Sequence, residues 1–307
     1  KTRGDELKHA VGVAKVVGNR PVKLIWTREE DMRNDKYRPQ AAIRFQGGLD
    51  ASGKMTTLHM QSAVGAIGAA AVANPKMVDR QAMDGLADSV VYTKVPNWFL
   101  GVNMKNTHVP VAFWPSVGGS QNGFFMESFI DEMAHAAGKD PVAFRRSLTD
   151  RPDVLGVLEM AAQKGDWGKP LPKGKGRGFA IVDSFGVIIA HVAEVTVADN
   201  GEVKVDRVVA VLDPYHVANP KLVAAQVEGG VMYGLSAVLW GEITIKDGAV
   251  EQGNFDTYPV VRLAQAPKVE VYLHLSGAKD EKGVAKWGGV GECTVAPLAP
   301  AVANAIF

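Results

Sequence analysis

A glycine-rich segment near the carboxyl end of the chain carries the residue best suited to chemistry. Gly288, Gly289, Val290 and Gly291 stand directly before Glu292. Glycine has no side chain, so backbone N–H groups in such a segment can closely approach an anion or a cofactor. A carboxylate held beside it in a partly dry pocket is a candidate general base. We therefore select Glu292 as the candidate base, although a turn with a capping Glu is the commoner origin of this pattern when it stands alone.

Cys293 is the only cysteine of the chain. A single cysteine forms no intramolecular disulfide and cannot hold an iron–sulfur cluster alone, because such clusters need about four thiolate ligands. A nucleophilic thiol at Cys293, as in a thiol hydrolase, is a separate hypothesis, which the lack of a His near it in sequence disfavours. The seven His residues form no H-x-H or H-E-x-x-H pair. The sequence therefore predicts no metal site built from protein ligands.

The composition excludes several classes of protein. Of the 307 residues, 47% are hydrophobic and 22% are charged, which excludes an intrinsically disordered chain. The 34 basic and 33 acidic residues give a net charge of +1, so no nucleic-acid partner is predicted. No uninterrupted apolar run reaches the roughly 20 residues of a membrane-spanning helix.

The elements that must position Glu292 are predicted from hydrophobic spacing and turn residues. A long amphipathic helix carries an apolar stripe, with Glu127 and Asp131 off that stripe. Gly138 ends this helix, and Asp140 and Pro141 cap and open the next one. In the first half we expect a helix over 5–17, a strand over 21–26, a hairpin over 43–62, and helices over 120–137 and 142–148.

The second half is richer in strands, and its elements are not in regular βαβ alternation. We expect strands over 179–182, 187–197, 203–212 and 269–275, a long helix opened by Asn219 and Pro220, a hairpin over 242–252, and a last helix after Pro297. This order predicts an α+β fold with mixed sheets and packed helices in two elongated lobes. We place the first lobe at 1–150, a Gly-, Pro- and Lys-rich linker at 151–177, and the second lobe, with Glu292, at 178–307.

Several motifs occur in an order that is typical of one family. They are 23–32 (KLIWTREEDM), 116–122 (SVGGSQN) followed by 127–132 (ESFIDE), 226–235 (QVEGGVMYGL), 254–259 (NFDTYP), and 288–292 (GGVGE) followed by 297–306 (PLAPAVANAI). In these motifs and their order, the chain resembles the molybdopterin-binding large (beta) subunit of the isoquinoline 1-oxidoreductase type. That type lies in the xanthine dehydrogenase and aldehyde oxidase superfamily.

The resemblance implies a molybdenum hydroxylase that uses water as its oxygen source. The substrate would be an N-heterocycle or an aldehyde, and the Glu at the position of Glu292 would deprotonate a hydroxyl ligand of molybdenum. The pterin holds the metal in this family, so a chain without metal-ligand clusters is no obstacle. The residues implied for cofactor binding are Ser116, Val117, Gly118, Gly119, Gln121, Gln226, Gly289, Val290 and Gly291, although helix capping or close helix packing explains those in helices equally well.

The resemblance also implies partners. It implies a molybdenum–molybdopterin cofactor in the cytosine dinucleotide form of bacterial relatives, and a small partner subunit that holds a 2Fe-2S cluster. A cytochrome c is the expected final electron acceptor, and the periplasm is preferred to the cytoplasm. The Gly-Gly-Gly-Phe-Gly loop of the family is not in this sequence, so we expect an N-terminal part of the same polypeptide to complete the site.

Three departures from the family pattern bear on activity. Pro115 stands where relatives commonly have Arg, which removes a fixed positive charge and a backbone N–H. Cys293 replaces a Pro, and residues 213–216 (DPYH) replace a more typical Asp-Cys-Gly. The Pro115 departure and the missing Gly-Gly-Gly-Phe-Gly loop favour an alternative function, a cofactor-less fragment or homologue that acts as a binding or structural partner.

Overall fold

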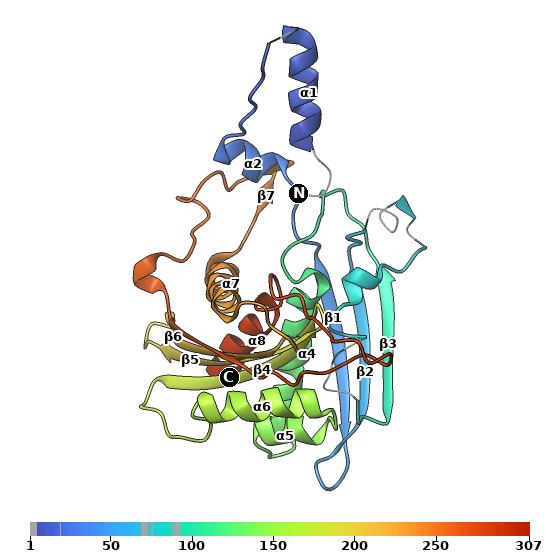
Figure 1. Ribbon diagram of the computed structural model, residues 1–307, viewed down its shortest axis with the longest axis vertical. Helices are drawn as coiled ribbons and strands as arrows, with labels where there is room; N and C mark the ends of the chain where they lie inside the picture. The colour runs from blue at the N-terminus through green and yellow to red at the C-terminus, as the bar shows by residue number, and fades with distance from the viewer. Residues whose placement is uncertain (1–4, 19, 69–72, 75, 88, 90–92) are drawn as a thin grey trace.

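The chain folds into two larger β-sheets, a small two-stranded one and a set of helices packed around them, as the computed structural model in Figure 1 shows. The structure describes residues 5–18, 20–68, 73–74, 76–87, 89 and 93–307. Both larger sheets contain parallel and antiparallel pairs. The predicted α+β class with mixed sheets is confirmed.

The first sheet has three strands in the order β1-β2-β3. β1 (Ala41–Leu49) and β2 (Met55–Val64) form the predicted antiparallel hairpin, and β3 (Asn97–Met104) runs parallel to β2. The hairpin turn is fixed locally: the Asp50 carboxylate accepts hydrogen bonds from the backbone N–H groups of Ser52 and Lys54.

The second sheet has four strands in the order β4-β5-β6-β9. β4 (Lys175–Ser184), β5 (Val187–Val197) and β6 (Val203–Asp213) form an antiparallel meander. β9 (Lys268–Leu273) then pairs with β6 in parallel. All four strands were predicted, with boundaries that differ by a few residues.

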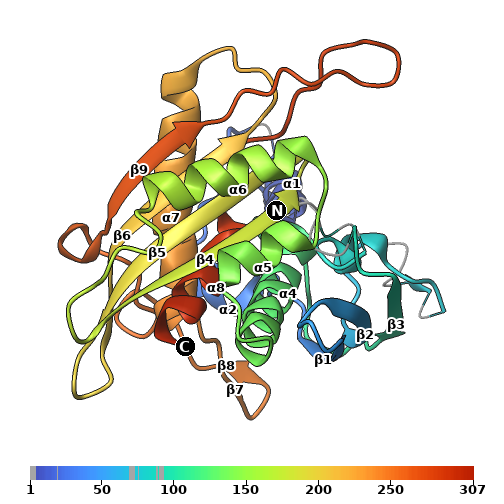
Figure 2. The same ribbon diagram turned by 90° about the horizontal axis from the view of Figure 1, so that it is seen from below.

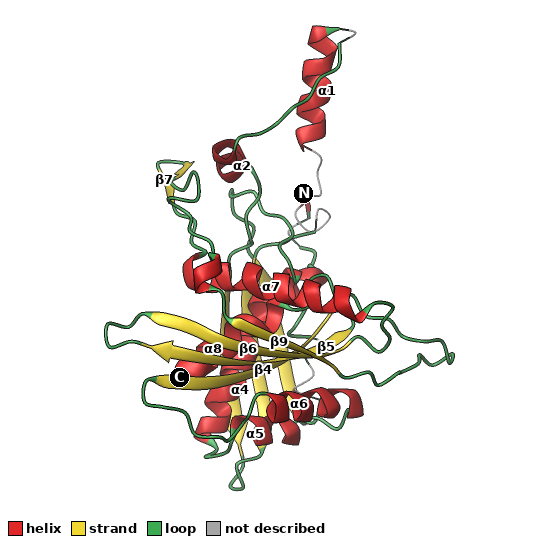
Figure 3. Cartoon of the chain, turned by 60° about the vertical axis from the view of Figure 1, so that its left-hand side comes forward, coloured by secondary structure: helices red, strands yellow, loops and turns green. Residues whose placement is uncertain are grey.

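Helices cover both faces of the second sheet. In Figure 3, α7 (Pro220–Trp240) and α8 (Val295–Ile306) lie on one side, with α5 (Pro141–Ser147) and α6 (Pro152–Lys164) on the other. Figure 2 shows α6 lying over the sheet, where it packs against β5 and β6. α4 (Val117–Ala136) packs against α8, β1 and β4 and so joins the two sheets.

This layered arrangement explains the apolar composition of the central strand. Residues 187–193 of β5 are all buried, because helices cover the sheet on both faces. One core cluster includes Ile130, Leu158 and Ile188, and a second includes Leu235 and Leu298. The first cluster contains residues from both predicted lobes.

The expected linker over 151–177 is wrong for most of its length. Pro152 opens α6, and Val154, Val157 and Leu158 of this helix are fully buried against the sheet. Proline is suited to the first helical turn, where its missing N–H would have no partner in any case. The Gly-, Pro- and Lys-rich composition belongs to the turn that leads into β4, not to an interdomain linker.

The amino-terminal part is only partly as predicted. α1 (Asp5–Val17) has the expected bounds, but it extends away from the rest of the molecule and leaves Leu7 and Val16 exposed. Residues 21–27 form no strand and lead to α2 (Arg28–Asn34). The alternating side chains are present, but a strand also needs a neighbouring strand to pair with, and none of the described strands pairs with them.

Two further elements differ from expectation. The hairpin over 242–252 shrinks to two-residue strands, β7 (Ile245–Lys246) and β8 (Ala249–Val250). The last helix starts at Val295, two residues earlier than expected. By length and composition α7 could cross a membrane, but in this structure it packs against α8 and β9.

Candidate functional site

The structure brings two of the family-like motifs into direct contact. The Ser116 hydroxyl donates a 2.6 Å hydrogen bond to the backbone carbonyl oxygen of Glu292, 176 residues further along the chain. Ser116 is 1% exposed, so water does not compete for this bond. α4 begins at Val117, three residues before the predicted start, which places Ser116 at its amino terminus.

The backbone at this contact is strained. Ser116 and Val117 have φ angles of 67° and 46°, in the left-handed region that residues with a side chain rarely adopt. The strain is greatest for Val117, whose Cβ is branched. The Ser116 side chain caps no N–H of α4; its hydroxyl donates to the Glu292 carbonyl oxygen. Such strain persists only where the surroundings hold it in place, and it is concentrated at functional sites.

Glu292 lies in a half-buried environment. Burial raises the pKa of its carboxyl above the ordinary value. Burial also raises the pKa of Tyr233 on α7, and the nearby charge of Glu292 contributes a smaller increase. The Tyr233 ring packs against Trp114, with 5.3 Å between ring centroids. A carboxylate with a raised pKa next to aromatic side chains is a stronger proton acceptor than one in water.

The glycines of the two motifs have different roles. A side chain at Gly118 would overlap the backbone of Gln81, so this glycine permits close packing. The N–H of Gly289 donates to the Phe185 carbonyl oxygen at 2.9 Å, so it is not free to bind a cofactor as predicted. Gly291, in contrast, has open space where a side chain would lie. Of these two predicted cofactor-binding glycines, only Gly291 therefore leaves room for a group to approach its backbone.

The remaining predicted cofactor residues are in three settings. Gly119 is buried in the first turn of α4, and Val290 is half-buried and packs with the core cluster of Cys293. Gln226 is exposed on α7. On the same helix, a Cβ atom added at Gly230 would lie 2.9 Å from the Cβ atom of Thr294, so α7 closely approaches the residues that follow Glu292. These contacts place α7 beside the loop that carries Glu292.

Two buried polar groups near the site have no hydrogen-bond partner among the described residues. They are Nε2 of Gln121, a residue only 8% exposed, and Oγ1 of Thr294. A buried donor without a partner costs free energy, so its presence in a folded protein requires an explanation. A ligand that accepts a hydrogen bond would satisfy the Gln121 amide.

Cys293 does not fit the role of a nucleophile. Its side chain is fully buried, and burial raises the pKa of the thiol to about 12. The reactive thiolate is therefore disfavoured at neutral pH. Within the described part of the chain, no three His, Cys, Asp or Glu side chains group as metal ligands.

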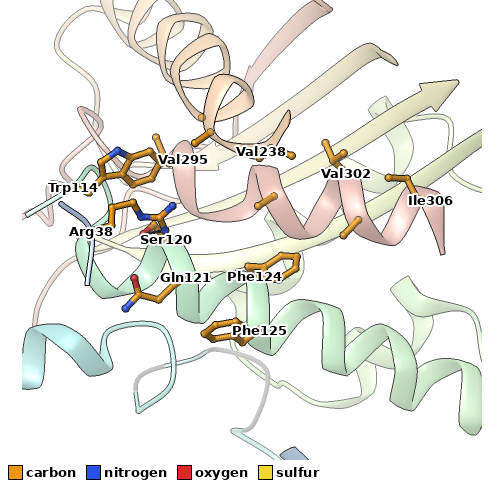
Figure 4. A pocket seen from close by; sticks show the side chains of 14 residues that line it. Arg38, Trp114, Ser120, Gln121, Phe124, Phe125, Val238, Val295, Val302 and Ile306 are labelled. Carbon is orange, nitrogen blue, oxygen red and sulfur yellow. Dashed lines mark hydrogen bonds between the residues drawn. The ribbon is translucent and has the colours of Figure 1, made fainter. Parts of the chain in front are cut away.

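A pocket of about 380 Å³ opens next to this site, between α4, α7 and α8. Figure 4 shows Arg38, Trp114 and Ser120 at one end, and Val302 and Ile306 of α8 towards the other. Sequence reasoning missed Arg38, Trp114 and Tyr233 as site residues. Trp114 directly precedes Pro115 and Tyr233 lies inside the 226–235 motif, so both were within reach of a motif-based analysis, whereas Arg38 carries no comparable signal.

Comparison with known proteins shows which family this chain resembles. Two family models, both described as a molybdopterin cofactor-binding domain, match residues 1–148 and 147–267. The chain is 31% identical over 344 aligned residues to a protein named membrane-bound aldehyde dehydrogenase [pyrroloquinoline-quinone] of Gluconacetobacter polyoxogenes, covering 100% of this chain and 42% of that protein. It is 28% identical to isoquinoline 1-oxidoreductase subunit beta of Brevundimonas diminuta, covering 97% of this chain and 38% of that subunit.

The fold also matches a solved structure. Quinoline 2-oxidoreductase from Pseudomonas putida 86 superposes with a TM-score of 0.80 at 13% identity, over 98% of this chain and 63% of that one. The sequence thus spans about two fifths of the length of the two curated relatives.

Proposed function

This chain belongs to the molybdopterin-binding family of xanthine dehydrogenases and aldehyde oxidases, and we propose that it forms part of the catalytic polypeptide of a molybdenum-dependent oxidoreductase. The proposed reaction is hydroxylation of an N-heterocycle or oxidation of an aldehyde, with water as the oxygen source. The observation that carries this proposal is the hydrogen bond from Ser116 to the Glu292 carbonyl, since it joins the two family motifs at one site.

The residues of this chain fit a molybdopterin cofactor in three respects. The buried Gln121 amide lacks a partner among the described residues, and the backbone at Gly291 is open to an approaching group. The site offers N–H and O–H donors and no described cluster of metal ligands, which suits a cofactor that brings its own ligands. When bound, the cofactor would supply the centre that accepts two electrons from the substrate.

Glu292 is the proposed general base. Its raised pKa matches proton transfer at a pH closer to neutral than an ordinary carboxyl allows. The bond from Ser116 fixes the backbone of Glu292 relative to the start of α4, so the carboxylate projects from a fixed point of the chain. Tyr233 lies close enough for the charge of Glu292 to raise its pKa, and its ring packs against Trp114, so the carboxylate is near an aromatic pair.

The proposal also includes partners and a compartment. The one cysteine of this chain cannot hold a 2Fe-2S cluster, and on the family resemblance we place that cluster on a small partner subunit through which electrons leave to a cytochrome c. The cytosine dinucleotide form of the cofactor and the periplasm rest on the family resemblance alone.

The test uses the full-length polypeptide purified with its partner subunits. We expect about one molybdenum per chain. Glu292→Gln keeps the size of the side chain but cannot accept the proton, so we expect molybdenum to be retained while turnover falls about 10²–10⁴-fold. Glu281→Gln, at an exposed position of the preceding loop, serves as the matched control and should have normal turnover.

Two outcomes would contradict the proposal. Turnover of Glu292→Gln close to that of the unmodified enzyme would remove the assigned role of Glu292. Active, intact material without molybdenum would instead support the alternative of a cofactor-less binding partner.

A further inference from the structure

The pocket between α4, α7 and α8 has one charged residue among its 14 lining residues, and this residue is Arg38. The others are mostly apolar, among them Phe124, Val238, Val295 and Val302. Its volume of about 380 Å³ lies within the range of about 300–1,000 Å³ that is typical of pockets for small molecules. The pocket is thus an apolar space with a single cation at one end (Figure 4).

The Arg38 guanidinium is held in a defined orientation. Its Cζ atom lies 4.1 Å from the centroid of the Trp114 ring, and Nη2 donates a 3.0 Å hydrogen bond to Ser120 Oγ. Stacking occupies the face of the guanidinium but not its edges, so other N–H groups stay available in the plane. An oriented guanidinium is pre-organised to bind a planar anion through two parallel hydrogen bonds.

The charge of Arg38 is not neutralised within the described part of the chain. No carboxylate there forms an ion pair with it; its polar contact is the uncharged Ser120 hydroxyl. Other arginines differ: Arg145, Arg151, Arg177 and Arg207 each pair with at least one carboxylate. An unpaired cation at the end of an apolar pocket is complementary to an anion that carries an apolar body.

We propose that this pocket binds a carboxylic acid with a hydrophobic body, its carboxylate on Arg38 and its apolar part between α7 and α8. The proposal rests on the function above, because such an acid is either the product of aldehyde oxidation or a substrate that carries a carboxylate. In both cases Arg38 recognises a carboxylate that is attached to an apolar group.

Binding is tested by calorimetric titration of the full-length holoenzyme with octanoate and with octanamide, which has the same chain but no charge. We expect octanoate to bind about 10- to 100-fold more tightly, since a hydrogen-bonded charged pair contributes that much. Arg38→Gln should remove this preference and leave octanamide binding within twofold. Arg44→Gln, at an exposed position on β1, is the matched control and should leave the affinity for both ligands unchanged.

A second variant tests the apolar part of the site. Ala303 of α8 lines the pocket, so the larger side chain of Ala303→Leu fills part of its volume and should weaken the binding of both octanoate and octanamide. Equal binding of the two ligands by the unmodified enzyme, or an unchanged octanoate affinity in Arg38→Gln, would overturn the proposal.

Steady-state kinetics separate the two sources of the acid. For a substrate role, Arg38→Gln should raise KM for 4-carboxybenzaldehyde at least tenfold and leave KM for its methyl ester unchanged. For a product role, the variant should instead weaken inhibition by octanoate without changing either KM. Molybdenum content and the Glu292→Gln result do not depend on Arg38, so failure of this proposal and failure of the proposed function are distinguishable.

Discussion

The Ser116 hydroxyl holds the backbone carbonyl of Glu292 at 2.6 Å, and this bond connects the start of α4 to the loop that carries the candidate base. Among the residues that the structure describes, no hydrogen bond or ion pair holds the Glu292 carboxylate, so the position of this side chain depends on its backbone. Ser116 is therefore a positioning residue, because it acts on the reaction only through Glu292.

Ser116→Ala should lower kcat by up to about tenfold, which is the rate equivalent of one hydrogen bond of about 0.5–1.5 kcal/mol. Molybdenum content should stay normal, and KM should change little because the pocket walls are intact. A kcat equal to that of the unmodified enzyme would show that the bond does not position the base.

Ser116→Gly is the matched control for backbone strain at this position. Both variants lose the hydroxyl, but only glycine adopts the φ of 67° without steric cost. We expect the Gly variant to unfold at a higher temperature than the Ala variant, with a free energy of unfolding that is larger by about 1 kcal/mol. Equal unfolding midpoints would indicate that the left-handed conformation is not strained.

The pH dependence of kcat/KM should report the state of Glu292. The carboxyl must be ionised to accept a proton, so activity falls as the pH drops through its pKa. Because burial raises this pKa, the acid limb should lie above the ordinary value of about 4.3. The limb should be absent from the residual activity of Glu292→Gln, and an unchanged limb in that variant would assign it to another group.

Elements fixed by short-range chemistry were predictable from the sequence. The Asn219 side chain caps α7 by accepting hydrogen bonds from the N–H groups of Lys221 and Leu222, and Asp140 caps α5 in the same way. Such caps depend on residues two or three positions apart, so the sequence contains the whole interaction.

Features that depend on distant partners were not predictable. The left-handed backbone at Ser116 and Val117 follows from contacts with a loop far along the chain, and no residue type signals it. Glu127 and Asp131 lie off the apolar stripe of α4, which is typical of a solvent-exposed face, yet both are buried. Their burial is compensated because Arg145 of α5 pairs with both carboxylates.

Two glycines in long helices should respond in opposite ways to alanine. Gly118→Ala places a methyl group against the Gln81 carbonyl and should destabilise the protein by about 1–3 kcal/mol. Gly229 on α7 has open space around its Cα, so Gly229→Ala should stabilise the helix by about 0.5–1 kcal/mol. Thermal unfolding of the full-length protein measures both shifts, and a shift of the same sign in both variants would contradict this assignment.

The buried Arg145 should be a main determinant of stability. Its Nε donates to the Glu127 carboxylate at 2.8 Å, and the same carboxylate oxygen accepts the N–H of Ile181 in β4 at 2.9 Å. The two side chains of this pair are each 1% exposed. Arg145→Met would leave a buried carboxylate unpaired, so we expect a loss of about 3–5 kcal/mol.

The neighbouring Arg146 provides the control for that prediction. Its guanidinium lies 3.5 Å from Glu159, but the two side chains are 55% and 57% exposed. Solvent screens such a pair, so Arg146→Met should cost less than about 1 kcal/mol. We expect the unfolding midpoint of the full-length protein to fall sharply for Arg145→Met and little for Arg146→Met. Similar small shifts in both variants would mean that the core tolerates an unpaired Glu127 and that this ion pair is not a main determinant of stability.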